Sequence, residues 1–182
     1  MDDGQAIRRL KRGDIGGLET LVSYYQVKAV RTAYLVTHDE AMAEDVVQEA
    51  FVRIYQRIHG FDESRPFETY LMRSVINGAL NAVRRQRRSV PLDGNEVEVE
   101  ALLAKARSVE SQVEYTQLQQ DLLVALSRLS PRQRTTVVQR YYLEMSEREM
   151  ARALKVAPGT VKWLLNAARA RLRELLGSTR RA

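Results

Sequence analysis

Apolar residues recur at steps of three and four along most of the chain. No stretch keeps the alternation of apolar and polar residues that is typical of a half-buried strand. Only four prolines and nine glycines interrupt the pattern. It therefore predicts an all-α protein, with helices over residues 3–12, 14–37, 39–59, 67–88, 110–129, 131–143, 147–154 and 158–176.

One segment breaks this periodicity. From Ser89 to Ser108 the chain reads SVPLDGNEVEVEALLAKARS, with a proline, a glycine and several acidic residues, which is the composition of a linker. We therefore expect two small helical domains, residues 1–90 and 111–182, joined by a flexible acidic linker over residues 91–110.

Two predicted helices of the first domain have contrasting faces. In DEAMAEDVVQEAFVRIYQRI the spacing buries Val46, Val47, Ala50, Phe51, Ile54 and Ile58. The outer face carries Asp45, Gln48, Glu49, Arg53 and Gln56. A solvated face explains this second set as well as a binding surface does, so spacing alone leaves the choice open.

The helix over residues 67–88 has a more specific outer face. Phe67, Leu71, Val75 and Ala82 are expected to pack inward. The opposite face carries Tyr70, Arg73, Asn77, Asn81, Arg84 and Arg88. Aromatic rings stack on bases and guanidinium groups pair with phosphates, so this face suits single-stranded nucleic acid. Gly78, which lacks a Cβ, is expected to permit the close approach of another backbone.

The C-terminal segment predicts a helix-turn-helix. Ser146 and Glu149 form a capping box, and Pro158 suits the first position of the next helix. That helix has an apolar stripe of Val161, Leu165, Ala168, Leu172 and Leu175, and a polar face of Lys162, Asn166, Arg169 and Arg173. In this motif the second helix presents its N-terminal end to the DNA major groove. A generic helical hairpin is the alternative.

Charge and composition narrow the function classes. The net charge is +6, and residues 131–182 carry 12 Lys and Arg against four Asp and Glu, which favours a polyanionic partner. The chain has no cysteine and two separated histidines, and no nucleophile motif is present. We therefore expect no metal, no cofactor and no enzymatic activity. Without a signal peptide or a long apolar run, the protein is expected to be cytoplasmic, with no membrane insertion.

Four segments in order resemble a known family. These are AEDVVQEAFVRIY, FDESRPFETYLMRSVINGALNAVRRQRR, LLVALSRLSPRQRTTVVQRYYLEMSEREMARALKVAPGTVK and ARARLREL. They are similar to regions 2 and 4 of bacterial extracytoplasmic-function (ECF) sigma factors, over nearly the whole chain. The resemblance implies a subunit that recruits core RNA polymerase to promoter DNA. Region 2 would capture the melted minus-ten strand, and region 4 would bind the minus-thirty-five duplex.

The resemblance also implies roles for individual residues. Core polymerase would be bound by Asp45, Gln48, Glu49 and Arg53. The melted minus-ten strand would be bound by Phe61, Tyr70, Arg73, Asn77, Asn81, Arg84, Arg85, Arg87 and Arg88, with the segment HGFDESRPF closing over an extruded base. The minus-thirty-five duplex would be bound by Arg132, Arg134, Arg148, Thr160, Lys162, Trp163, Asn166 and Arg169.

The chain departs from the family pattern after GTVK. Trp163, Leu164 and Ala167 replace residues that usually face DNA in the family, so altered minus-thirty-five specificity is expected. Trp163 could instead form an apolar patch that contacts a protein such as an anti-sigma factor. Tyr141 and Tyr142 could equally be core or docking surface.

Three functions are therefore compared. The first is a promoter-reading sigma factor, with an anti-sigma factor as a further partner that the family admits. The second is a sigma-like mimic that binds an anti-sigma factor or polymerase without reading a promoter, which the altered recognition helix favours. The third is a hydrolase or nuclease, which the absence of a catalytic motif disfavours.

Overall fold

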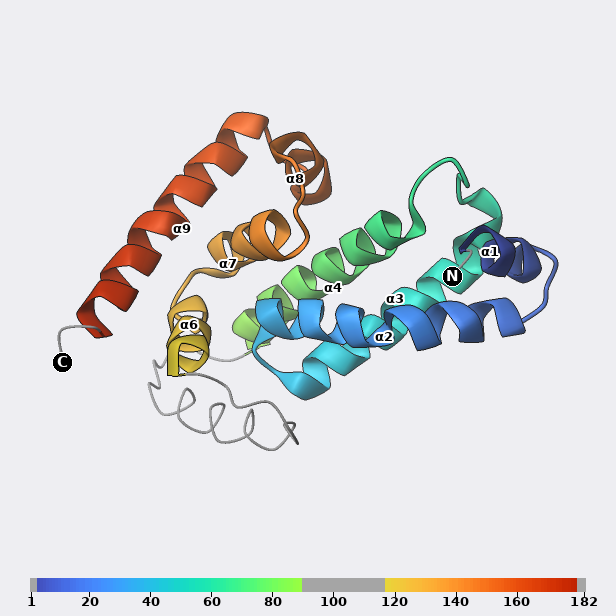
Figure 1. Ribbon diagram of the computed structural model, residues 1–182, viewed down its shortest axis with the longest axis horizontal. Helices are drawn as coiled ribbons and strands as arrows, with labels where there is room; N and C mark the ends of the chain where they lie inside the picture. Colours follow the sequence, from blue (N-terminus) through green and yellow to red (C-terminus); the bar gives the residue numbers. More distant parts are fainter. Residues whose placement is uncertain (1–2, 90–116, 180–182) are drawn as a thin grey trace. The chain divides into compact units, whose positions relative to one another are not determined.

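The computed structural model of the chain describes residues 3–89 and 117–179, and it confirms the all-α fold (Figure 1). No strand occurs within those two ranges. The chain forms two compact units, residues 1–82 and 83–182. The predicted linker over residues 91–110 lies outside the described residues, so the predicted domain boundaries stay predictions.

The first unit is a bundle of helices (Figure 1). Its elements are α1 (Asp3–Lys11), α2 (Gly16–Thr37), α3 (Glu40–Arg57), the 3-10 turn η1 (Ile58–Gly60) and the beginning of α4 (Phe67–Ser89). Helix α2 packs against both α1 and α3, and η1 contacts α1 and α3. These contacts bring the N-terminal helix next to the segment that leads into α4.

Helix α3 follows its predicted pattern closely. All six residues of the predicted apolar stripe, from Val46 to Ile58, are buried. The Asp39 side chain caps the helix by accepting a hydrogen bond from the backbone N–H of Met42, at 2.9 Å. The preceding helix, α2, ends at Thr37, and His38, which follows it, adopts a left-handed conformation with φ 55°.

The close backbone approach occurs at a different glycine from the predicted one. A Cβ on Gly78 would lie 3.0 Å from Cγ1 of Val46, which is a side-chain atom of α3, so the expectation of a neighbouring backbone there was wrong. A Cβ on Gly17 would lie 2.3 Å from the backbone oxygen of Ala6. Glycine at position 17 therefore permits α2 to cross closely over α1.

The second unit contains the predicted helix-turn-helix. Its helical elements after α4 are α6 (Gln117–Ser127), α7 (Pro131–Val137), the π-helical turn η2 (Val138–Tyr142), α8 (Glu147–Leu154) and α9 (Pro158–Thr179). Helix α9 packs against α6, α7 and α8. The predicted helix over residues 131–143 is correct in extent, but its last turn is π-helical rather than α-helical.

Local capping fixes where α7 and α8 begin. Ser130 and Gln133 form one capping box, and Ser146 and Glu149 form the predicted second one. Helix α8 ends at Leu154, and Lys155, which follows it, adopts a left-handed conformation with φ 54°. The turn then places Pro158 at the start of α9. An apolar cluster that includes Met150, Val161 and Leu165 holds α8 and α9 together.

Candidate nucleic-acid interface

The outer face of α4 is polar and accessible. Arg73, Asn81, Arg84 and Arg85 are exposed, and Tyr70 and Asn77 are half-buried. The side chains of Arg87 and Arg88 lie outside the described residues. The opposite face of the helix contributes Leu71, Val75 and Ile76 to the core. The helix therefore presents amides, guanidinium groups and one aromatic ring along a single accessible face, as the sequence predicted.

The two aromatic residues predicted to stack on a base differ in their accessibility. Phe61 is only 7% exposed, because its ring packs against Phe67 and Tyr70, with ring centroids 5.8 and 5.0 Å apart. This burial corrects the expectation that Phe61 offers a stacking surface. Tyr70, in contrast, keeps part of its surface accessible at the start of α4.

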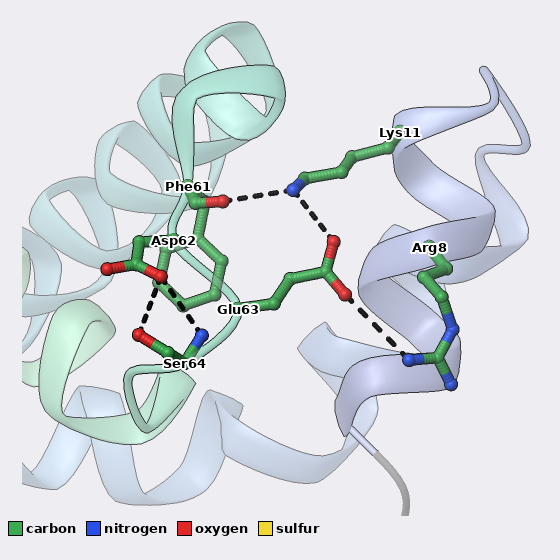
Figure 2. Close-up of polar contacts among 6 residues, drawn as sticks. All are labelled: Arg8, Lys11, Phe61, Asp62, Glu63 and Ser64. Atoms are coloured by element: carbon green, nitrogen blue, oxygen red, sulfur yellow. Dashed lines mark hydrogen bonds and ion pairs between the residues drawn. The ribbon is translucent and has the colours of Figure 1, made fainter.

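The loop between η1 and α4 has internal order (Figure 2). Oδ1 of Asp62 accepts hydrogen bonds from the backbone N–H of Ser64 at 3.1 Å and from the Ser64 hydroxyl at 2.7 Å. These hydrogen bonds lower the pKa of the Asp62 carboxyl, because they stabilise its charged form. Arg65 forms an ion pair with Asp62 at 3.2 Å. The loop thus has a preferred conformation although its side chains from Asp62 to Arg65 are exposed.

The outer face of α3 is exposed along its length. Asp45, Gln48, Glu49 and Arg53 are all exposed, and Arg53 pairs with Glu49 at 3.5 Å. Two apolar residues on this helix, Val52 and Tyr55, are exposed as well. Neither residue was predicted from the spacing to have a role, although the position of each one off the buried stripe was a visible signal. The face therefore combines charged and apolar groups, a composition suited to a protein partner.

The residues predicted for the duplex surface on α9 are accessible. Lys162, Trp163, Asn166 and Arg169 are exposed, Thr160 is half-buried, and Trp163 is 66% exposed. Leu164 is 5% exposed and belongs to the core, so it corrects the expectation that this position faces DNA. Of the three departures from the family pattern, Trp163 is therefore the one that most alters the exposed surface of the helix.

The arginines before α9 are placed differently from one another. Arg132 and Arg148 are exposed, as a contact with the DNA backbone requires. Arg134 is only 5% exposed, and its burial corrects the expectation that it supports the duplex. Both arginines lie near the start of α7, just after the Ser130 cap. Spacing alone did not show that Arg134 points inward and Arg132 outward.

A tyrosine that the sequence left unassigned contacts a predicted DNA-binding residue. Nε of Arg169 donates a hydrogen bond to the hydroxyl of Tyr141 at 2.7 Å, and the guanidinium carbon lies 5.8 Å from the centre of the tyrosine ring. Tyr141 and Tyr142 are both exposed, so they are surface rather than core. Tyr141 restricts the directions in which Arg169 can point.

Among the described residues, no group of three or more His, Cys, Asp or Glu could hold a metal ion. None of the helices in residues 3–89 and 117–179 is long and apolar enough to cross a membrane.

Comparisons with known proteins identify the family. Residues 21–89 match the model of Sigma-70 region 2, and residues 119–172 match that of Sigma-70 region 4. The chain is 30% identical over 176 residues to the ECF RNA polymerase sigma factor SigW of Bacillus subtilis, covering 93% of this chain and 94% of that protein. The chain belongs to the ECF sigma factors.

Other known proteins match over a similar extent. The RNA polymerase sigma-E factor of Streptomyces avermitilis is 34% identical over 169 residues, covering 93% of this chain and 90% of that protein. Among solved structures, CnrH in complex with the cytosolic domain of CnrY has a TM-score of 0.66 at 23% identity, covering 97% of both chains. The sigma factor RpoE of Bartonella quintana, bound to the anti-sigma factor NepR, has a TM-score of 0.64 at 20% identity and covers 87% of this chain and 96% of that one. These structures support the same fold.

Proposed function

We propose that the protein is a dissociable sigma subunit that binds core RNA polymerase, recognises promoter DNA and promotes strand opening. The observation that carries this proposal is that this chain matches both region 2 and region 4, in that order. A curated ECF sigma factor also aligns over 93% of the chain. The protein contributes binding surfaces and no catalytic group of its own. It acts in the cytoplasm, where promoter DNA and polymerase are found.

Core polymerase binds the outer face of α3. Asp45, Gln48, Glu49 and Arg53 supply its charged and polar contacts, and their exposure supports this role. The exposed Val52 and Tyr55 add the apolar surface that a protein interface needs at its centre. The ion pair between Arg53 and Glu49 is exposed and weak. Replacing it by contacts with polymerase on docking therefore costs little free energy.

The melted minus-ten strand binds the outer face of α4. Extruding a base from the stack costs a few kcal/mol, which hydrogen bonds to the base edge and stacking can offset. Asn77 supplies the hydrogen bonds and Tyr70 the ring, because both are accessible on this face. Arg73, Arg84 and Arg85 pair with phosphates, a contribution that is independent of sequence and falls with rising salt. Their exposure supports this assignment.

The minus-thirty-five duplex binds the N-terminal half of α9. Lys162 and Arg169 contact phosphates or base edges, and Asn166 can form a bidentate pair with an adenine. Trp163, with most of its surface exposed, can lie against a thymine methyl group. The Tyr141 contact holds Arg169 in one orientation before DNA arrives, which lowers the entropy lost on binding.

Transcription in vitro tests this function. Core polymerase and this protein are incubated with fragmented genomic DNA, and the transcript starts are sequenced. Discrete starts that share two spaced upstream motifs support the proposal. If Trp163→Ala then changes only the upstream motif, Trp163 reads that motif. Polymerase binding without discrete starts would instead favour a sigma-like mimic whose recognition helix binds a protein.

A further inference from the structure

Polar contacts join the N-terminal helix, α1, to the loop between η1 and α4 (Figure 2). Nζ of Lys11 donates a hydrogen bond to the backbone oxygen of Phe61 at 2.9 Å and another to Oε1 of Glu63 at 2.8 Å. Nη1 of Arg8 lies 3.8 Å from the other carboxylate oxygen of Glu63. One ammonium group thus joins a main-chain and a side-chain acceptor from the same loop.

Lys11 is held in place by the helix that carries it. Ala6, Ile7 and Leu10 of α1 are buried, and α2 crosses the helix closely at Gly17. Lys11 is the last residue of α1, where the helix dipole favours a positive charge. Its ammonium group therefore extends from a fixed backbone position.

The loop has few other attachments to the rest of the first unit. Its side chains from Asp62 to Arg65 are exposed, and the Asp62 hydrogen bonds to Ser64 remain within the loop. Those hydrogen bonds set the shape of the loop, but they do not set its position relative to α4. The buried Phe61 ring fixes one end, and the Lys11 contacts fix the residues that follow it.

We propose that Lys11 is a positioning residue that holds this loop in place for capture of an unpaired promoter base. The proposal rests on the proposed function of the α4 face. Helix α1 lies outside residues 21–89, the range that matches the region 2 family model. The Lys11 contacts therefore join α1, which lies outside the matched region, to the loop between η1 and α4, which lies inside it.

The expected effect is moderate. The Lys11 to Glu63 ion pair is partly exposed, and such pairs contribute little by themselves. The hydrogen bond to the Phe61 carbonyl is charge-assisted, and it restrains the main chain directly. Loss of both contacts should slow promoter opening about 3-fold to 10-fold, which corresponds to the net contribution of one ordinary intramolecular hydrogen bond.

Three variants of the whole chain test whether Lys11 acts by positioning the loop or only through its positive charge. Lys11→Met removes both contacts and keeps an unbranched chain of similar reach. Lys11→Arg restores a cation that can reach the same acceptors. Arg12→Met is the matched control, because Arg12 is exposed beside Lys11 and its side chain forms no hydrogen bond or ion pair with the loop among the described residues. Two quantities are measured. The first is hydrogen exchange of the amides of residues 61–65, and the second, in holoenzyme, is the opening rate separately from polymerase affinity.

The proposal expects faster exchange and slower opening for Lys11→Met, with polymerase affinity unchanged. It also expects recovery in Lys11→Arg and wild-type behaviour in Arg12→Met. Unchanged exchange in Lys11→Met would overturn it, as would equal slowing of opening by Arg12→Met. If the wild-type holoenzyme opens no promoter, the proposed function fails, and the exchange comparison still decides whether Lys11 positions the loop.

Discussion

At the scale of single residues, burial separates side chains that the sequence grouped together. Spacing placed Asn77 and Arg73 on an accessible face correctly, because a helical face is set by the positions of its apolar residues. It did not predict the burial of Phe61 or Arg134. Phe61 precedes α4 and Arg134 lies near the start of α7, so no apolar stripe defines the direction of either side chain. The contacts of Lys11 with Phe61 and Glu63 were also missed, because they join segments far apart in the sequence.

Asn77→Ala tests the strand-capture face. We expect promoter opening to fall about fivefold to tenfold, because the amide loses its hydrogen bonds to the extruded base. Polymerase affinity should not change, since Asn77 lies on α4 and the proposed docking face lies on α3. Opening rates and polymerase affinity are measured in parallel. An equal loss of both would show that the face is misassigned.

Gln139 is a buried polar residue without a hydrogen-bond partner for its side chain among the described residues. It is 0% exposed, and neither Nε2 nor Oε1 is paired there. Burying an unsatisfied amide is unfavourable, so Gln139→Met should raise the free energy of unfolding by about 1–2 kcal/mol. Urea unfolding followed by circular dichroism measures the change. Gln26→Met is the control at an exposed site in α2, and a loss of stability in Gln139→Met would contradict the prediction.

At the scale of elements, the sequence predicted most helices because their signals are local. The serine caps, Pro158 and the apolar stripes of α3 and α9 each determine their element without help from distant residues. The π-helical turn η2 was missed because it leaves the apolar spacing nearly intact. Such turns often occur at functional sites, and this one carries Tyr141, which contacts Arg169 of the proposed recognition helix.

The capping box of α8 predicts a pH dependence. Hydrogen bonds from the Ser146 hydroxyl and backbone lower the pKa of Glu149 below its ordinary value of 4.5. The ionised carboxylate therefore stabilises the folded protein above about pH 4.5, and this contribution is lost as the pH falls through the lowered pKa. Hydrogen exchange in α8 measured against pH should show this loss in the wild type and a weaker one in Glu149→Gln.

Ser146→Ala tests the other half of the same cap. It removes the hydroxyl that accepts from the backbone N–H of Glu149, at a cost of about 1 kcal/mol in the stability of the second unit. Urea unfolding measures this cost. An unchanged midpoint would show that α8 is held by its apolar cluster alone.

At the scale of the whole molecule, the two units divide the proposed task. The first unit carries the α3 face and the beginning of the α4 face, and the second carries the α9 face. The sequence indicated this division through charge, since residues 131–182 are strongly basic and the segment before them is acidic. A partner that held both units could silence both DNA contacts at once.

In the proposed mechanism, the α4 face captures an unpaired strand while the α9 face binds duplex. Photo-crosslinking within the holoenzyme–promoter complex tests it most directly, with p-benzoylphenylalanine replacing Tyr70 in one protein and Trp163 in another. We predict that position 70 crosslinks to the unpaired strand near the transcript start and position 163 to duplex further upstream. Crosslinks from position 163 to protein alone, or from position 70 to paired DNA, would contradict the account.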